Sequence, residues 1–337
     1  MIRFRRAIYP AKLTIMFLNL DNLPSPSVGT TGWPWTEKSQ FISKSVLDKS
    51  KWFKISIVTP SYNQGHFIEE TIRSVLLQGY PNLEYIIIDG GSQDNSVEII
   101  KKYEQYITYW VSEPDRGQSH ALNKGFAKAT GEIMAWLCAD DFYLPNALMT
   151  IANHFRRFPS CKLVYGNRYI ADSNSQIIRR DKFDYVDPKA IYNWCYICTP
   201  ATFWHKCLWL ETGGQIDEKN YFTMDWDLMI RMIRLHPPIK LDYFITVIRR
   251  HSRTKTYIGM THQRKERDLE IIKVSRKYSG YFCFNSITYI FYQIACCHWY
   301  FQGMPKIIYS IIFRLLHLPL QFIRILYGNP KSSLLND

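Results

Sequence analysis

The sequence has no glycine-rich phosphate-binding loop, because neither a G-x-x-x-x-G-K-[ST] nor a G-x-G-x-x-G pattern occurs in it. P-loop ATPases, protein kinases and dinucleotide-dependent dehydrogenases rely on such loops, so these classes lose their main support. A diphosphate bound by this chain would have to be neutralised by a metal ion and by basic side chains instead.

Regular cysteine spacing is also missing, since the eight cysteines do not follow the pattern of a secreted disulfide scaffold. Cys195 and Cys198 form a single C-x-x-C pair, for which a zinc or redox role stays open. Small buried side chains in a reducing compartment are the favoured interpretation. The apolar run from Leu13 to Leu20 lacks a convincing signal-peptide core and cleavage site, so we expect a protein on the cytoplasmic side of the membrane.

The 337 residues are 47% hydrophobic and 21% charged, which indicates a globular chain with a sizeable core. The net charge of +13 is concentrated at the two ends, and the stretch from Arg249 onward holds 14 Lys or Arg against 4 Asp or Glu. Basic ends suit nucleic acid or anionic lipid. The aromatic and aliphatic neighbours favour lipid, so we expect an anionic membrane surface and no nucleic acid as partner; a solvated basic face is the alternative.

Short apolar runs alternate with helical patterns from residue 55 to residue 141. The expected strands are Ile55–Pro60, Leu83–Asp89, Ile107–Ser112 and Glu132–Asp141, and the expected helices are His66–Gln78, Asn95–Tyr106 and Gln118–Lys128. This order predicts an α/β fold built from right-handed βαβ units around a mostly parallel sheet. Further along, Lys162–Asn167 is strand-like and Met224–Leu235 is helix-like.

Polar side chains gather where these predicted strands end. Pro60, Ser61, Tyr62 and Asn63 follow the first strand, Asp89 ends the second, and Asp140 and Asp141 end the fourth. Because parallel sheets bind ligands at the carboxyl ends of their strands, we expect one polar site on one edge of the sheet.

Two adjacent acids at the end of an apolar strand repel each other unless a cation or hydrogen-bond donors neutralise them. Asp140 and Asp141 therefore predict a site for Mg²⁺ or Mn²⁺, with Asp140 the better ligand. The alternative is that Asp141 caps a helix starting near Pro145. Asp225 and Asp227 point to different faces of their helix, so one can face the site, for instance as a general base, while the other pairs with Arg231.

Three ordered segments resemble family 2 glycosyltransferases with the GT-A fold, from about Lys54 to about Gly259. They read ISIVTPSYNQGHFIEETIRSVLLQGYPNLEYIIIDGGSQDNS, EPDRGQSHALNKGFAKATGEIMAWLCADDFYLP and CTPATFWHKCLWLETGGQIDEKNYFTMDWDLMIRM. The resemblance implies a GT-A domain in which a nucleoside-diphosphate sugar donates its sugar to an acceptor hydroxyl.

The resemblance also implies roles for individual residues. Pro60, Ser61 and Tyr62 hold the nucleotide base, and Asp89 contacts uracil or ribose. Asn63, Arg116, Asp140 and Lys255 bind the nucleotide-sugar, Asp140 and Asp141 ligate the metal, and Asp225 is the general base. Direct displacement then inverts the anomeric centre. The residues Thr199–Thr202 would form the acceptor region, Gly213–Gly214 a tight turn, and the basic stretch Arg249–Thr256 would offer His251 and Lys255 to the diphosphate, with a solvated loop as the alternative.

The sequence departs from the family pattern in four places. Cys138 stands where the first acid of D-x-D often lies, Met224 replaces the Glu of a common Glu-Asp pair, and His120 occupies a position that is often Asp. His120 could be packed or belong to the site. The Q-x-x-R-W motif of processive synthases is absent, so we expect transfer of one sugar.

Two alternative functions stay open beside this one. A nucleotidyltransferase of similar architecture would also use paired acids on a metal, but it would carry a glycine-rich basic loop near its first strand. A non-catalytic nucleotide-sugar-binding protein would not need Asp89, Asp140, Asp141 and Asp225 together.

We expect three regions: a basic leader and linker over 1–53, a glycosyltransferase domain over 54–260, and a basic aromatic tail over 261–337. The domain divides into a nucleotide-sugar half (54–145) and an acceptor half (146–260). In the tail, Tyr281–Phe301 and Ile307–Tyr327 are long apolar segments, and every charged side chain between Gly280 and Gly328 is a Lys or Arg. A pair of interfacial helices is favoured over spanning helices or a partner-binding surface. The enzyme would then lie on the cytoplasmic face of the plasma membrane and act on a lipid-linked glycan in cell-envelope polysaccharide synthesis.

The tail can be tested by deleting every residue after Tyr278. Each Lys or Arg near an anionic surface contributes about 1 kcal/mol, and buried apolar area adds to this. The truncated protein should therefore lose sedimentation with anionic liposomes but still bind UDP. Aggregation or loss of UDP binding would instead place the tail in the core of the domain.

Overall fold

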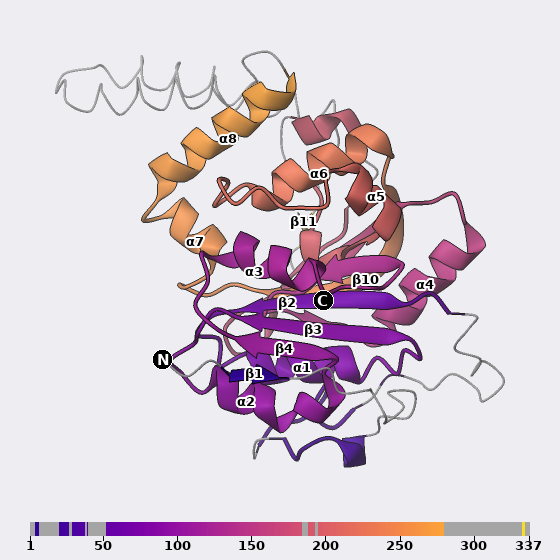
Figure 1. Cartoon of the computed structure of the whole chain (residues 1–337), viewed down its shortest axis with the longest axis vertical. Helices are drawn as coiled ribbons and strands as arrows, with labels where there is room; N and C mark the ends of the chain where they lie inside the picture. Colours follow the sequence, from indigo (N-terminus) through magenta and orange to yellow (C-terminus); the bar gives the residue numbers. More distant parts are fainter. Residues whose placement is uncertain are drawn as a thin grey trace.

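A computed structural model of the chain describes residues 4–6, 20–26, 29–37, 39, 52–183, 188–192, 195–279 and 332–333 (Figure 1). These residues form a mixed α/β structure around one curled sheet with the strand order β1-β4-β3-β2-β5-β9-β7-β10-β6. The fold class predicted from the sequence is confirmed.

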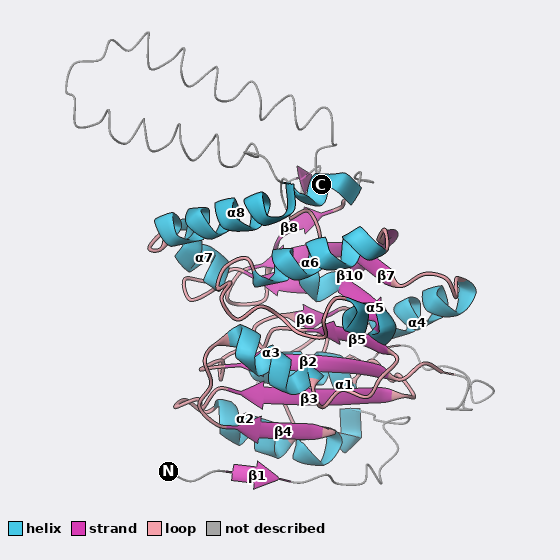
Figure 2. Cartoon of the chain, turned by 45° about the horizontal axis from the view of Figure 1, so that its top comes forward, coloured by secondary structure: helices cyan, strands magenta, loops and turns pink. Residues whose placement is uncertain are grey.

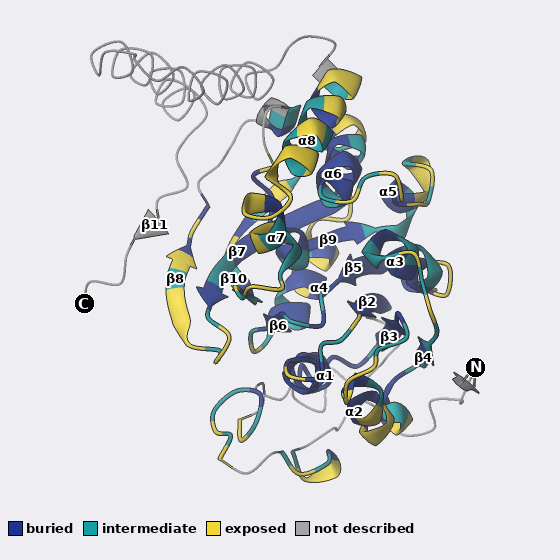
Figure 3. Cartoon of the chain, turned by 90° about the vertical axis from the view of Figure 1, so that its left-hand side faces the viewer, coloured by how far each residue is buried: buried dark blue, intermediate teal, exposed yellow. Residues whose placement is uncertain are grey.

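The first half of the sheet is parallel and contains β2 (Ile55–Ser61), β3 (Leu83–Asp89), β4 (Tyr109–Ser112) and β5 (Ile133–Trp136). Every residue of β2 and β3 is buried, as continuous apolar runs in a parallel sheet require (Figure 3). The crossover helices are α1 (Ile68–Leu76), α2 (Ser96–Lys102) and α3 (Gln118–Phe126). Helix α3 covers one face of the sheet and α1 lies on the other (Figure 2).

The second half of the sheet is mostly antiparallel. Its strands are β6 (Phe142–Tyr143), β7 (Leu163–Ala171), β8 (Ile177–Asp181), β9 (Thr202–His205) and β10 (Ile239–Arg249). Strand β9 joins the halves by pairing antiparallel to both β5 and β7, whereas β10 runs parallel to β7. Strand β10, which ends at Arg249, and strand β5 therefore belong to the same sheet.

Helices and short strands complete the architecture. They are α4 (Ala147–Arg157), α5 (Lys206–Glu211), α6 (Met224–Leu235), α7 (Lys255–Met260) and α8 (Arg264–Ser279), with β1 (Phe4–Arg6) beside β4, β11 (Ser332–Ser333) beside β8, and 3-10 turns at Leu20–Asn22, Glu104–Tyr106, Pro188–Tyr192 and Thr199–Ala201.

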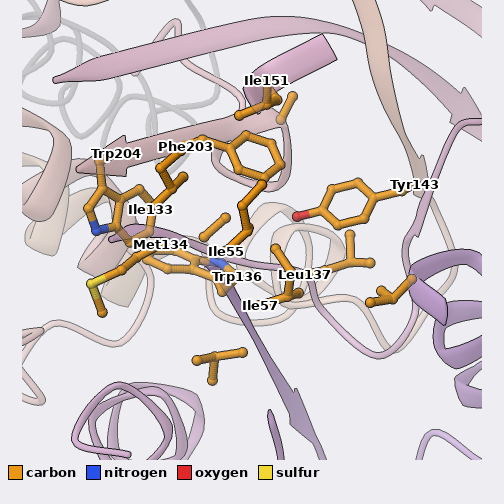
Figure 4. Close-up of a cluster of buried hydrophobic side chains, with 14 of the residues drawn as sticks. Ile55, Ile57, Ile133, Met134, Trp136, Leu137, Tyr143, Ile151, Phe203 and Trp204 are labelled. Carbon is orange, nitrogen blue, oxygen red and sulfur yellow. The ribbon is translucent and has the colours of Figure 1, made fainter. Parts of the chain in front are cut away.

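Side chains from both halves of the sheet meet in one core (Figure 4). Ile55 and Ile57 of β2 and Ile133 of β5 are fully buried there, and Trp136 packs edge-on against Trp204 of β9 with ring centroids 5.6 Å apart. Large rings that bury this much apolar area fix the two halves relative to each other. The chain that leaves β5 at Trp136 therefore starts from a rigid position.

The fourth predicted strand is shorter than expected. It ends at Trp136, and after Leu137, whose amide still bonds to Val58 of β2, residues 138–141 form a turn in which the Asp141 amide bonds back to the Cys138 carbonyl at 3.0 Å. The two acids thus lie on a turn after the strand. The predicted helix Asn95–Tyr106 also breaks, because α2 ends at Lys102 and a 3-10 turn follows buried Tyr103. The prediction Met224–Leu235 matches α6.

Part of the predicted leader packs on the domain through Arg73 of α1. Its buried guanidinium donates to the carbonyl oxygens of Pro24 (2.9 Å), Pro34 (3.1 Å) and Trp35 (3.1 Å). Trp33 adds a bond from its indole N–H to the Tyr143 carbonyl at 2.7 Å. The region boundaries at 53 and 260 remain predictions.

Among the described residues, none of the helices combines the length and the apolar character that crossing a bilayer requires. The two tail segments predicted to be interfacial helices, 281–301 and 307–327, lie outside those residues.

Candidate active site

The site is built around the acid turn, Cys138–Asp141, which follows β5. Thr71 of α1 holds its backbone, because the Thr71 hydroxyl lies 2.9 Å from the Ala139 carbonyl oxygen and 2.6 Å from that of Asp141. The acid turn is therefore held by α1, a crossover helix whose Thr71 lies 68 residues before Ala139.

Arg249, the last residue of β10, holds the acid turn from the other side. Its backbone amide donates to Asp141 Oδ1 at 3.0 Å, and its guanidinium donates to the Asp140 carbonyl and to the Glu70 carboxylate. Ser175 Oγ accepts a further bond at 2.9 Å. Arg249 is only 1% exposed, so its charge must be neutralised inside the protein, and Glu70 of α1 does this.

The sequence analysis missed this role of Arg249. Its place in the basic stretch Arg249–Thr256 suggested a cation for a diphosphate, but the guanidinium lies between the rings of Phe67 (5.1 Å) and Phe142 (4.8 Å) and bonds to the protein itself. A charged residue ending an apolar strand was the available signal. It does not reveal a partner on α1.

The acid turn brings three possible metal ligands together. One ligand atom each from Cys138, Asp140 and Asp141 lie within 4.8 Å of one another. Asp140 Oδ2 is also 3.2 Å from Nε2 of His251, whose ring stacks on Phe67 with centroids 4.6 Å apart. Two carboxylates and an imidazole fit a hard or borderline divalent cation, whereas the Cys138 thiol does not suit Mg²⁺.

Asp141 does not cap a helix, contrary to the alternative considered from the sequence. Helix α4 begins after Asn146, and Asp141 Oδ1 instead accepts the Arg249 amide. Burial, and then the neighbouring charge of Asp140, raise the pKa of Asp141 well above its usual value. A bound cation would remove this cost of keeping two adjacent carboxylates ionised.

Asp225 lies in the first turn of α6 and faces the same region. Its Oδ2 accepts a bond from Thr199 Oγ1 at 3.3 Å, and burial raises the pKa of its carboxyl. Asp227 points elsewhere and pairs with Arg231 at 2.9 Å, as its spacing from Asp225 requires. The predicted acceptor region Thr199–Thr202 thus provides a direct contact to the predicted base.

Gln118 joins Lys255 to the acid turn. Lys255 Nζ donates to Gln118 Oε1 at 2.9 Å, and Gln118 Nε2 lies 3.2 Å from Cys138 Sγ. Burial lowers the pKa of Lys255, while the charge of Asp225 opposes this shift. The cation of Lys255 therefore lies beside the acid turn and within electrostatic range of Asp225. Gln118 carried no signal in the sequence analysis.

The predicted base-binding residues lie at the carboxyl ends of β2 and β3. Ser61 is buried, and its hydroxyl has no hydrogen-bond partner among the described residues, whereas Tyr62 is 60% exposed. Asn63 adopts a left-handed φ of 52° and is fixed by bonds of 2.8 Å to Ser92 Oγ and from the Gln93 amide. The loop is thus shaped by backbone contacts, with Ser61 left unsatisfied.

Asp89 shapes the neighbouring loop. Its fully buried carboxylate accepts four bonds, from the amides of Gly91 and Ser92 and the hydroxyls of Ser92 and Ser112, at 2.5 to 3.1 Å. Its predicted contact with the nucleotide remains a prediction, and holding the loop is the role that its contacts show.

Four further residues singled out from the sequence have other contacts. Arg116 is exposed and pairs with Glu218 at 2.8 Å, and its amide donates to Nδ1 of His120 at 3.2 Å. His120 therefore packs at the start of α3. In the described part of the chain Cys195 and Cys198 are free thiols, the first exposed and the second buried.

Residues 56–214 match the family model described as Glycosyl transferase family 2. An uncharacterized glycosyltransferase of Rickettsia felis is 28% identical over 208 residues, covering 57% of this chain and 33% of the relative. Another, of Rickettsia prowazekii, is 27% identical over 229 residues, covering 64% of this chain and 70% of the relative. The chain spans about a third of the length of the first of these relatives.

Solved structures share the fold. TarS 1-349 of S. aureus in complex with UDP has a TM-score of 0.50 at 16% identity, covering 68% of this chain and 72% of that one. The mannosyltransferase PcManGT from Pyrobaculum calidifontis in complex with GDP-Man and Mn²⁺ also has a TM-score of 0.50, at 18% identity, covering 67% of this chain and 65% of that one. At these identities the likeness shows the GT-A fold.

The clamp formed by Arg249 and Glu70 can be tested by stability. Arg249→Met leaves a buried carboxylate without its cation and should lower the free energy of unfolding by about 3–5 kcal/mol. Adding Glu70→Gln removes that charge, so the double variant should regain most of the loss in urea denaturation. A double variant no more stable than the single one would contradict the pairing.

Proposed function

We propose that this chain, whose residues 56–214 match the family model of glycosyl transferase family 2, transfers a single sugar from a nucleoside-diphosphate sugar to an acceptor hydroxyl with inversion. The observation that carries the proposal is that Lys255 lies within electrostatic range of Asp225 and is joined through Gln118 to the acid turn. A candidate base and a candidate diphosphate site thus lie near one cation. Nucleoside diphosphate release across a panel of nucleotide-sugars with membrane lipid acceptors tests the proposal.

The nucleotide base would bind at Pro60–Asn63. The buried Ser61 hydroxyl and the buried Gln64 Oε1 atom have no hydrogen-bond partners among the described residues, and a polar ligand would satisfy both. Exposed Tyr62 offers a ring for stacking. The neighbouring structures are complexes with UDP and with GDP-Man, so a uridine or guanosine nucleotide is the first choice for binding trials.

The diphosphate would lie at the acid turn, where Asp140, Asp141 and His251 could hold Mg²⁺ or Mn²⁺. A divalent cation there would supply positive charge to the leaving diphosphate. Lys255 adds a second positive charge from α7. This pair of charges replaces the glycine-rich loop that the sequence lacks.

Asp225 would take the proton from the acceptor hydroxyl. Thr199 holds Oδ2 of its carboxylate, and the nearby charge of Lys255 favours the ionised form that a base requires. Burial acts in the opposite direction and raises the pKa of Asp225, which makes its carboxylate a stronger proton acceptor. Attack from the face opposite the leaving group then inverts the anomeric centre.

The acceptor proposal rests on the sequence of the tail. Its positive, apolar segments suit an anionic cytoplasmic leaflet, so a lipid-linked glycan of a cell-envelope polysaccharide is the acceptor class we favour. A soluble enzyme would meet such an acceptor slowly, and binding to the membrane removes this limit.

Asp140→Asn should weaken metal-dependent UDP binding by about tenfold or more, because it removes an anionic oxygen from the metal site. Calorimetry with Mn²⁺ and with EDTA measures this, and Glu98→Gln, an exposed acid on α2, is the matched control. Equal affinity with and without EDTA in the wild-type protein would contradict the metal assignment.

Asp225→Asn should retain donor binding but lower turnover by about a hundredfold or more, as loss of a general base does. Wild-type turnover should fall as the pH drops through the raised pKa of Asp225, since protonation removes the base. The residual activity of the variant should lack this acidic limb. Near-normal transfer by Asp225→Asn would mean that the base lies elsewhere.

A further inference from the structure

The segment that leads into the helix of Asp225 is held from a distant part of the chain. Among the described residues, the side chain of Thr223, the N-cap residue of α6, makes no capping hydrogen bond. Glu270 of α8, 47 residues downstream of Thr223, binds Thr223 and the two residues before it. Its carboxylate accepts the backbone amides of Tyr221 (3.0 Å), Phe222 (2.7 Å) and Thr223 (3.2 Å), and also the Thr223 hydroxyl (3.2 Å).

These contacts suit a carboxylate and no neutral side chain. Four donors converge on two oxygens that carry only lone pairs, and the negative charge faces the positive end of the α6 dipole. A glutamine would turn an N–H group toward one of the donors. Asp225 lies two residues after Thr223, in the first turn of α6. The direction of its carboxylate therefore depends on the position in which Thr223 is held.

A second contact joins the same two helices further along. Asp227 of α6 is fully buried, and its Oδ1 accepts bonds from Lys277 (2.8 Å) and Tyr278 (2.7 Å) of α8. Arg231 holds the other oxygen at 2.9 Å. Helix α8 therefore lies along α6 (Figure 2) and is attached at its middle, through Glu270, and near its C-terminal end, through Lys277 and Tyr278.

The cation of the site is tied to the same assembly. Helix α7, which carries Lys255, passes so close to the segment Tyr221–Thr223 that a Cβ on Gly259 would be 2.8 Å from the Phe222 ring and 3.2 Å from Arg267 Cδ. The charge of Glu270 also opposes the lowering of the pKa of Lys255 that burial causes. The Glu270 carboxylate thus holds the segment that leads into the helix of Asp225 and also lies within electrostatic range of Lys255.

We propose that Glu270 is a positioning residue for sugar transfer, which acts by fixing the segment Tyr221–Thr223 that leads into α6 and with it the Asp225 carboxylate. The proposal rests on the proposed function of Asp225. It gives a role in the reaction to one residue of α8, although this helix follows the segment that resembles the family and falls within the region predicted as tail.

The test compares Glu270→Gln with Lys277→Met in the full-length chain. Both remove a polar contact of α8, but only Glu270 binds the segment Tyr221–Thr223 that leads into α6, whereas Lys277 binds Asp227 within the helix. Glu270→Gln should lower kcat by about tenfold to a hundredfold with the donor KM and UDP affinity unchanged, because misplacement of a reacting group costs this much. Lys277→Met should lower the unfolding temperature and leave kcat within about twofold, as should the exposed control Glu266→Gln.

Amide hydrogen exchange gives a readout that needs no substrate. Exchange at Tyr221, Phe222 and Thr223 should be faster in Glu270→Gln and unchanged in Glu266→Gln. If the wild-type protein transfers sugar and Glu270→Gln matches its kcat, or if both α8 variants lower kcat equally, positioning by Glu270 is wrong and the proposed function stands. If the wild-type protein releases nucleoside diphosphate from no donor, the proposed function falls and the positioning proposal falls with it.

Discussion

The site depends on the ion pair between the buried guanidinium of Arg249 and Glu70. An arginine in a protein interior needs a partner for its charge and acceptors for its N–H groups. Glu70 on α1 supplies the charge, while the Asp140 carbonyl and Ser175 supply acceptors. Because Arg249 is held in this way, its bonds to Asp140 and Asp141 also fix the acid turn. Its two carboxylates are left side by side, an arrangement that favours the binding of a divalent metal.

The remaining parts of the site are held in the same way, by contacts between distant segments. Lys255 reaches Gln118 across 137 residues, Thr199 holds Asp225, and Glu270 holds the helix on which Asp225 lies. Each polar group in this chain of contacts has a partner from another element. The buried Ser61 hydroxyl differs, because within the described part of the structure it has none. In the proposed function, the nucleotide base would bind beside this hydroxyl.

Much of the fold could be predicted because its signals are local. Continuous apolar runs predicted β2 and β3, the helical period predicted α6, and strand ends predicted which polar residues would meet. The partners of Arg249 and the contacts of Glu270 could not be predicted, since each depends on residues about 50 or more positions apart, with no pattern in between. The end of β5 at Trp136 was missed for a local reason, because the Asp141 amide bonds back to the Cys138 carbonyl within a run typical of a strand. The tail remains a prediction from composition and charge.

In the proposed function, the acid turn and the end of β2 form one site for a nucleoside diphosphate and its metal. Crystals grown with UDP or GDP and Mn²⁺, measured at a wavelength where manganese scatters anomalously, would test this arrangement. We expect an anomalous peak in contact with Asp140 and near His251, with the base against Ser61 and Tyr62. Manganese bound away from Asp140, or a base bound away from Ser61, would contradict it.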